Sequence, residues 1–190
     1  MAQQEASIAA SERSFRIKPA RREDVPDLQA LIRGLAVYER LGAICVSTEA
    51  DLTQALFGSR PVAEALIARL DANPDLCVGF ALFFHTYSTF LGRPSLWLED
   101  LFVVPEHRER GVGRALLVAL AALARARDCG RFEWAVLDWN APAIGFYESL
   151  GATVLPDWRI ARITGQALAR LADGNAVCPA TSQRVRRSRG

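Results

Sequence analysis

The residues that bear most directly on chemistry form a basic, glycine-containing loop that follows an apolar stretch and precedes a second one. Arg108, Gly111 and Gly113 are spaced as Arg-x-x-Gly-x-Gly. If a helix begins at the end of this loop, its first backbone N–H groups lack partners and lie at the positive end of the helix dipole. The loop therefore predicts a binding site for a phosphate or pyrophosphate, with Arg110 and Arg114 beside it.

Two other interpretations of the glycine pair remain at this point. A Gly-x-Gly between a strand and a helix can serve only as a tight turn. A dinucleotide-binding loop would continue as Gly-x-Gly-x-x-Gly/Ala. Here the third position is Leu116, which is too bulky for the close contact between helix and strand that such a loop needs. The dinucleotide interpretation is therefore disfavoured.

The elements that must position this loop follow from the hydrophobic periodicity of the chain. We expect strands at residues 15–18, 62–70, 77–87, 96–104, 131–137, 152–155 and 158–163. We expect one helix that carries Leu28, Leu31, Ile32 and Leu35 and ends near residues 38–40, and others over 48–57, 112–128 and 140–151. The alanines of residues 62–70 also fit a helix, and we predict the strand there. Helices alternating with strands indicate a sheet with helices packed on it.

Length and composition predict one soluble domain. The chain has 190 residues, of which 51% are hydrophobic, and this is enough for one core but short for two. No apolar run reaches the about 18 residues of a membrane-spanning helix, and the N-terminus lacks a secretory pattern. We expect a disordered leader over residues 1–13, one domain over 14–173 and a disordered basic tail over 174–190, in a cytoplasmic protein with no membrane partner.

The cysteines, histidines and charges of the chain argue against a disulfide-rich, a metal-binding and a nucleic-acid-binding protein. The four cysteines are widely spaced and there are two histidines, so we expect neither a disulfide framework nor a metal site. Four arginines lie within the last seven residues, although the net charge is only +2. A tail of this kind can contact nucleic acid, but the rest of the chain is slightly acidic, which disfavours that partner.

Several motifs occur in an order that resembles the GNAT superfamily of acetyl-coenzyme A dependent N-acetyltransferases. The loop starting at Arg108 matches the pattern Arg/Gln-x-x-Gly-x-Gly/Ala, and residues 140–151 match an Asn followed by a Phe-Tyr helix that ends in Gly. More narrowly, Ala-Val-Tyr-Glu at 36–39, Trp-Leu-Glu-Asp-Leu-Phe-Val at 97–103 and Ala-Val-Leu-Asp-Trp-Asn-Ala-Pro at 135–142 resemble the spermidine/spermine (diamine) and thialysine N-acetyltransferases.

The resemblance implies a fold and a set of residues for acetyl-coenzyme A. The fold class would be α/β (α+β), with a mixed, mostly antiparallel sheet of six to seven strands, splayed at the fourth strand and flanked by about four helices. The family is usually homodimeric and needs no metal. The cofactor-binding residues that it implies are Leu101, Phe102, Val103, Arg108, Glu109, Arg110, Gly111, Val112, Gly113, Arg114, Asn140 and Tyr147.

The resemblance also implies roles at the acceptor site. Glu99 corresponds to the proposed base, acting through water, and Tyr147 to the acid that protonates the departing thiolate. Ammonium groups are held by carboxylates and aromatic faces, and the corresponding side chains are Tyr38, Glu39, Glu99, Asp100 and Trp158. Each of these residues also fits an ordinary structural role: Tyr147 and Trp158 in a core, Asn140 as a helix cap, and the others on a solvated surface.

The function hypothesis is acetyl transfer to a primary amine of a small cationic acceptor, such as a diamine, polyamine, thialysine or lysine-like molecule. Phe90 stands where the diamine family has a tryptophan, which weakens the case for a long polyamine. The alternatives are a catalytically silent module that binds acyl-coenzyme A, and an acetyltransferase for a protein or aminoglycoside amine.

Overall fold

The structure, a computed structural model, describes residues 14–174. These residues fall into two units, one that extends to Leu137 and one that begins at Asp138. The position of one unit relative to the other is not determined, so each is described by itself. The predicted leader and nearly all of the predicted tail lie outside the described residues. No helix between residues 14 and 174 is long and apolar enough to cross a membrane.

The first unit is built on a mixed sheet. Its five strands lie in the order β1-β2-β3-β4-β5, and all neighbours are antiparallel except β4 and β5, which are parallel. Each strand is therefore beside its neighbour in sequence. The strands are β1 (Phe15–Pro19), β2 (Glu64–Leu70), β3 (Cys77–Ser88), β4 (Arg93–Val103) and β5 (Arg131–Trp134).

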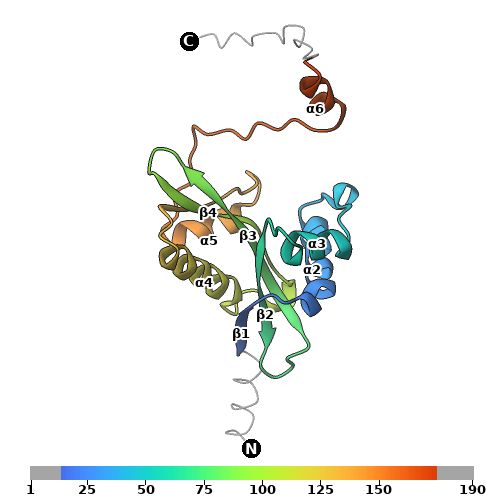
Figure 1. Cartoon of the computed structure of the whole chain (residues 1–190). Helices are drawn as coiled ribbons and strands as arrows, with labels where there is room; N and C mark the ends of the chain where they lie inside the picture. The colour runs from blue at the N-terminus through green and yellow to red at the C-terminus, as the bar shows by residue number, and fades with distance from the viewer. Residues whose placement is uncertain (1–13, 175–190) are drawn as a thin grey trace, which may run out of the picture. The chain divides into compact units, whose positions relative to one another are not determined.

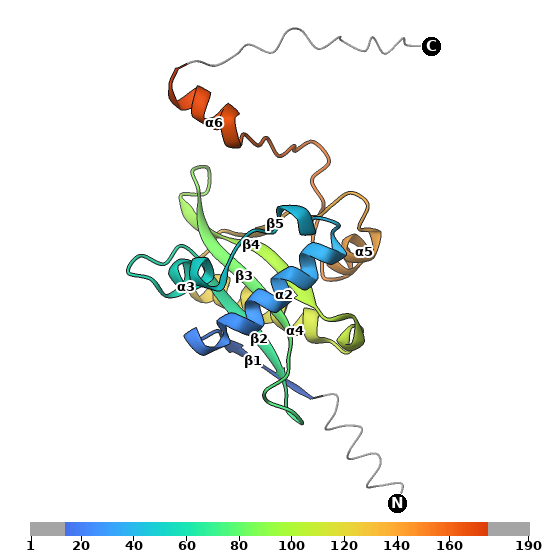
Figure 2. The ribbon, with the colours of Figure 1, turned by 90° about the vertical axis from the view of Figure 1, so that its right-hand side faces the viewer.

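Helices cover both faces of this sheet. Figures 1 and 2 show α2 (Val25–Tyr38) and α3 (Glu49–Phe57) on one face, and α4 (Val112–Ala126) on the other. Three short 3₁₀ turns complete the unit: η1 (Arg22–Asp24), η2 (Gly42–Ile44) and η3 (Pro105–His107). The parallel pairing of β5 with β4 requires a crossover, and α4 provides it.

Local capping determines where two of these helices begin. Thr48 accepts a hydrogen bond from the backbone N–H of Asp51, and the Asp51 carboxylate accepts one from the Thr48 N–H, so a capping box starts α3. Pro26 lies in the first turn of α2, where its missing N–H costs nothing. The predictions of a Thr48-capped helix and of a strand at β2 are confirmed.

The core is divided between the two faces by the alternation of side chains along the strands. Ala65 and Ile67 of β2 pack in the cluster that contains Leu28 and Leu31 of α2. The intervening Leu66 is also buried but belongs to the opposite face. There, α4 contributes the buried side chains of Val112, Leu116, Leu117, Leu120 and Ala124.

The second unit differs from the sequence prediction. It contains α5 (Ala141–Ser149), which was predicted, and α6 (Gly165–Ala172), which was not. The strands predicted at 152–155 and 158–163 are absent from the described residues, so the sheet has five strands rather than six or seven. A β-strand needs a neighbouring strand to pair its backbone N–H and C=O groups, and the described part of this unit offers no such neighbour. Five α-helices are therefore present between residues 14 and 174, against about four expected.

Candidate active site

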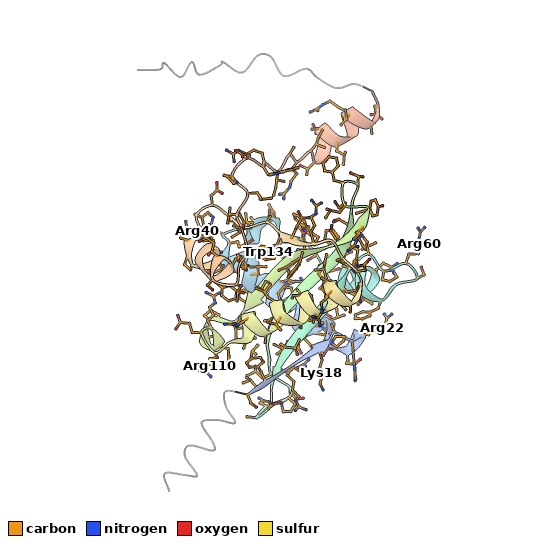
Figure 3. All side chains as sticks on the ribbon, turned by 90° about the vertical axis from the view of Figure 1, so that its left-hand side faces the viewer. Lys18, Arg22, Arg40, Arg60, Arg110 and Trp134 are labelled. Carbon is orange, nitrogen blue, oxygen red and sulfur yellow. The ribbon has the colours of Figure 1, made fainter. Side chains whose placement is uncertain are left out.

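The loop between β4 and α4 has the backbone of an anion-binding helix start. Gly111 is the N-cap of α4 in the left-handed conformation, with φ of 86°, which glycine adopts at little cost. No side chain caps the helix, and its first turn contains no acidic residue. Since α4 has 15 residues, its dipole and free N–H groups favour an anion at this end. Figure 3 shows Arg110 at this end of α4.

The three arginines of the loop lie in different surroundings. Arg110 and Arg114 are exposed, whereas Arg108 is half-buried. The Nε of Arg108 donates to the backbone carbonyl of Val103 at 3.1 Å. Its guanidinium carbon lies 4.6 Å from the ring centre of Tyr38 and 5.7 Å from that of Phe102. The sequence grouped the three arginines together, and the structure separates one of them from the other two.

Strand β4 leaves one side open near the loop. Its pairing with β5 runs from Ser95 to Leu98 and stops there. Val104 donates its N–H to the carbonyl of Val78 in β3. In an antiparallel pair, alternate residues direct their backbone N–H and C=O groups toward the partner strand, so those of Val103 and Leu101 are directed away from β3. The family resemblance implied a splay at this strand, and the structure shows that β4 has no β5 partner beyond Leu98.

Glu99 lies at an irregularity of β4. Leu82 of β3 is opposite Asp100, and the next residue of β3 is opposite Leu98, so Glu99 has no partner in the register. Such a bulge changes the direction in which a side chain points. The Glu99 side chain is exposed, and its Oε2 accepts a hydrogen bond from the indole Nε1 of Trp97 at 2.9 Å. Trp97 was not among the predicted site residues, although residues two apart on a strand share a face.

Carboxylates gather beside this bulge. Burial raises the pKa of Asp100 to about 6, and the negative charges of Glu99 and Glu39 add to the effect. Burial also raises the pKa of Glu39. The structure therefore brings two of the predicted acceptor residues, Glu39 and Glu99, within electrostatic reach of a third, Asp100. A cluster of this kind stabilises a cation, because a cation offsets both the mutual repulsion and the loss of hydration.

The end of α2 places Tyr38 and Glu39. The helix stops because Arg40 takes a left-handed conformation with φ of 62°, and Leu41 donates its N–H to the carbonyl of Ala36 at 2.8 Å. This is the hydrogen bond of a Schellman ending. Tyr38 and Glu39 are half-buried there, with the ring of Tyr38 against Arg108.

The remaining predicted residues belong to the second unit. Asn140 is buried and caps α5, since its Oδ1 accepts the N–H of Ala143. The ring of Tyr147 lies 5.5 Å from that of Phe146, and Trp158 is 74% exposed. These three residues are not placed against the Glu99 bulge, because the position of their unit relative to the first is not determined.

Comparison with known proteins assigns this arrangement to a family. The model of the acetyltransferase (GNAT) family matches residues 33–152. The chain belongs to the GNAT family. It is 34% identical to L-ornithine N5-acetyltransferase NATA1 of Arabidopsis thaliana, over 80% of this chain and 86% of that one. It is 36% identical to thialysine N-epsilon-acetyltransferase of Mus musculus, over 84% of this chain and 98% of that one.

A solved structure shares the fold of this chain. An integron cassette protein from the mobile metagenome of V. cholerae superimposes with a TM-score of 0.70 at 27% identity, covering 84% of this chain and 98% of that one. This GNAT protein is therefore an acetyl-coenzyme A dependent N-acetyltransferase that transfers acetyl groups to amines. Residues 14–174 contain no group of three or more side chains able to hold a metal ion.

Proposed function

We propose that this GNAT enzyme acetylates a primary amine of a small cationic acceptor, such as a diamine, polyamine, thialysine, ornithine or lysine-like molecule. The observation that carries the proposal is the group of carboxylates Glu39, Glu99 and Asp100, in which burial and like charges raise the pKa of Asp100. An acceptor with an ammonium group beyond the reacting amine would relieve this repulsion. An acceptor without one would leave it in place.

The co-substrate, acetyl-coenzyme A, supplies the activated acetyl group as a thioester. The residues between β4 and α4 fit its diphosphate, since the loop offers an uncapped helix N-terminus and exposed arginines. The open side of β4 at Leu101 and Val103 fits the amides of the pantetheine arm, with Phe102 between them. The diphosphate would be held by residues Arg108, Glu109, Arg110, Gly111, Val112, Gly113 and Arg114. By analogy with the family, Asn140 and Tyr147 are also proposed to bind the co-substrate.

The reaction needs an uncharged amine. An alkyl ammonium has a reference pKa of about 10.4, so removing its proton near neutral pH costs roughly 4–5 kcal/mol. Glu99 would accept this proton through a water molecule, and its exposure at the bulge supports that role because a water can reach it. The amine nitrogen then bonds to the acetyl carbon, and Tyr147 donates its phenolic proton to the sulfur as the C–S bond breaks. The proton that the nitrogen loses as the amide forms passes through water to the Tyr147 phenolate, which restores the phenol. Each such group typically contributes about 10²–10⁴-fold in rate.

The distal part of the acceptor would be held by Glu39, Asp100 and the aromatic face of Tyr38. Trp158 is also proposed as an acceptor-binding residue, by analogy with the family. Relatives that act on ornithine and thialysine support an acceptor of this size. Phe90 favours a short acceptor over a long polyamine, because it stands where the diamine family has a tryptophan. It is 97% exposed between β3 and β4. We also propose that the enzyme is a cytoplasmic homodimer, by analogy with its family.

An amine panel tests the proposal. The full-length protein is incubated with acetyl-coenzyme A and thialysine, L-ornithine, spermidine, a short diamine or an arylamine that is uncharged at neutral pH. Thiol release gives kcat/KM, and mass spectrometry identifies the acetylated product. We expect the short cationic acceptors to be used best. Preferential use of the arylamine, or thiol release with no amine at all, would contradict the proposal.

A further inference from the structure

Arg108 is the residue of the diphosphate loop that contacts the acceptor side of the site. Its Nε is engaged by the carbonyl of Val103, and its guanidinium lies over Tyr38. Arg110 and Arg114 are exposed on the same loop. Neutralising a phosphate does not require an arginine to be half-buried against Tyr38, which belongs to α2, so this contact indicates a further role for Arg108.

The surroundings of Arg108 hold its guanidinium in place from three directions. Phe102 lies 5.7 Å away and is itself 6% exposed, so it forms a fixed floor. Val103 fixes the Nε, and the ring of Tyr38 covers the guanidinium at 4.6 Å. This distance is well within the about 6 Å at which a cation is attracted to the face of an aromatic ring. Arginine suits the position because its planar group can stack and donate a hydrogen bond at once.

Two segments distant in sequence are thereby joined at this point. Tyr38 ends α2 next to Glu39, one of the clustered carboxylates. Val103 ends β4 on the side proposed for the pantetheine arm. Arg108 contacts both of them. A displacement of its side chain would therefore change the wall of the amine pocket as well as the strand edge that binds the co-substrate.

We propose that Arg108 is a positioning residue that fixes the Tyr38 ring in the wall of the amine pocket, and that it thereby couples amine binding to the coenzyme A loop. The inference rests on the proposed function, because it takes Tyr38 to be part of the acceptor site. It predicts that Arg108 and Arg110, two residues apart on one loop, differ in the substrate whose binding they control.

Five single variants, and Arg108→Gln combined with each of the two Tyr38 substitutions, test the inference. Arg108→Gln removes the cation and keeps an N–H donor, and Arg108→Lys restores the cation without the planar group. Arg110→Gln is the matched control on the same loop. Tyr38→Leu removes the ring, whereas Tyr38→Phe keeps it. The KM values of amine and acetyl-coenzyme A are measured for each variant, and coenzyme A binding is measured separately by calorimetry.

Arg108→Gln should raise the KM for the amine by about 5- to 30-fold, which is the range of one partly desolvated cation–π contact. Arg108→Lys should recover part of this loss. Arg110→Gln should instead raise the KM for acetyl-coenzyme A and leave that for the amine nearly unchanged. In the Tyr38→Leu background, Arg108→Gln should add little to the amine KM, whereas in the Tyr38→Phe background its effect should persist.

Two results would overturn the inference. One is an increase confined to the KM for acetyl-coenzyme A in Arg108→Gln, as in Arg110→Gln. The other is an effect on the amine KM that is the same in the Tyr38→Leu and Tyr38→Phe backgrounds. Failure of the proposed function looks different, because the unsubstituted enzyme would then show no preference for cationic amines while still binding coenzyme A in the calorimeter.

Discussion

Asp100→Asn tests the electrostatics of the acceptor site through the stability of the free enzyme. In the folded protein the pKa of Asp100 rises from 3.8 to about 6, first through burial and then through the charges of Glu99 and Glu39. A rise of this size corresponds to about 3 kcal/mol of unfavourable free energy for the ionised carboxylate. An asparagine has no charge and does not carry this cost, so the variant should be more stable than the parent above about pH 7.

The sign of the pH dependence follows from proton binding in the two states. Between pH 3.8 and about 6 the folded state holds a proton on Asp100 that the unfolded state has already released. The parent enzyme therefore loses stability as the pH rises through this interval, and the loss is complete above it. Near pH 4 or below, Asp100 is protonated in the folded state, and the benefit of the substitution should disappear.

The assay is urea unfolding of both proteins at about pH 8 and about pH 4. The stabilisation by Asp100→Asn should be up to about 3 kcal/mol greater at the higher pH. Comparing two pH values cancels any packing effect of the amide. Glu106→Gln, at an exposed carboxylate of η3, is the control. An effect of Asp100→Asn that is equal at both pH values would refute this account of the carboxylate group.

Three further substitutions test other parts of the enzyme. Tyr147→Phe should lower kcat by about 10²-fold or more with coenzyme A affinity nearly unchanged in calorimetry, and unchanged turnover would remove Tyr147 from the mechanism. Gly79→Ala should lower the free energy of unfolding by about 2 kcal/mol, because its Cβ would lie 2.8 Å from the backbone oxygen of Phe102; an unchanged Tm would contradict this. The hydrogen bond from Arg127 lowers the pKa of Glu64, so Glu64→Gln should destabilise the enzyme by less than about 1 kcal/mol at neutral pH and by less still in acid. Urea unfolding at both pH values measures these losses. A larger loss of stability in acid than at neutral pH would contradict the predicted pH dependence.

The sequence sufficed for the elements whose side chains repeat regularly. The spacing of Leu28, Leu31 and Leu35 predicted α2, and the glycines after Arg108 predicted the start of α4. These features are local, since they depend on helix periodicity and on one left-handed glycine. The strand register could not be derived in the same way, because a bulge arises only when two strands pair.

The departures from prediction have nonlocal causes. Strands were predicted at residues 152–155 and 158–163, but the described residues provide no neighbouring strand for them. Arg108 was grouped with Arg110 because the sequence shows charge and not burial. Its contact with Tyr38 joins residues 70 positions apart, and no spacing rule reaches that far. The raised pKa of Asp100 likewise arises first from burial, then from the charge of Glu99 and last from that of Glu39, and burial in particular depends on how the chain packs.

The central claim is that the carboxylates select a cationic acceptor. It is tested most directly by the ratio of kcat/KM for a short diamine to that for the alkyl monoamine of the same length, measured in the parent enzyme and in the double variant Glu39→Gln/Asp100→Asn. Both acceptors present the same reacting amine, and only the diamine carries a distal ammonium. We expect the ratio to be large in the parent enzyme and to fall by about 10-fold or more in the double variant, as for the loss of charge-assisted contacts. A ratio that is the same in both proteins would contradict the claim.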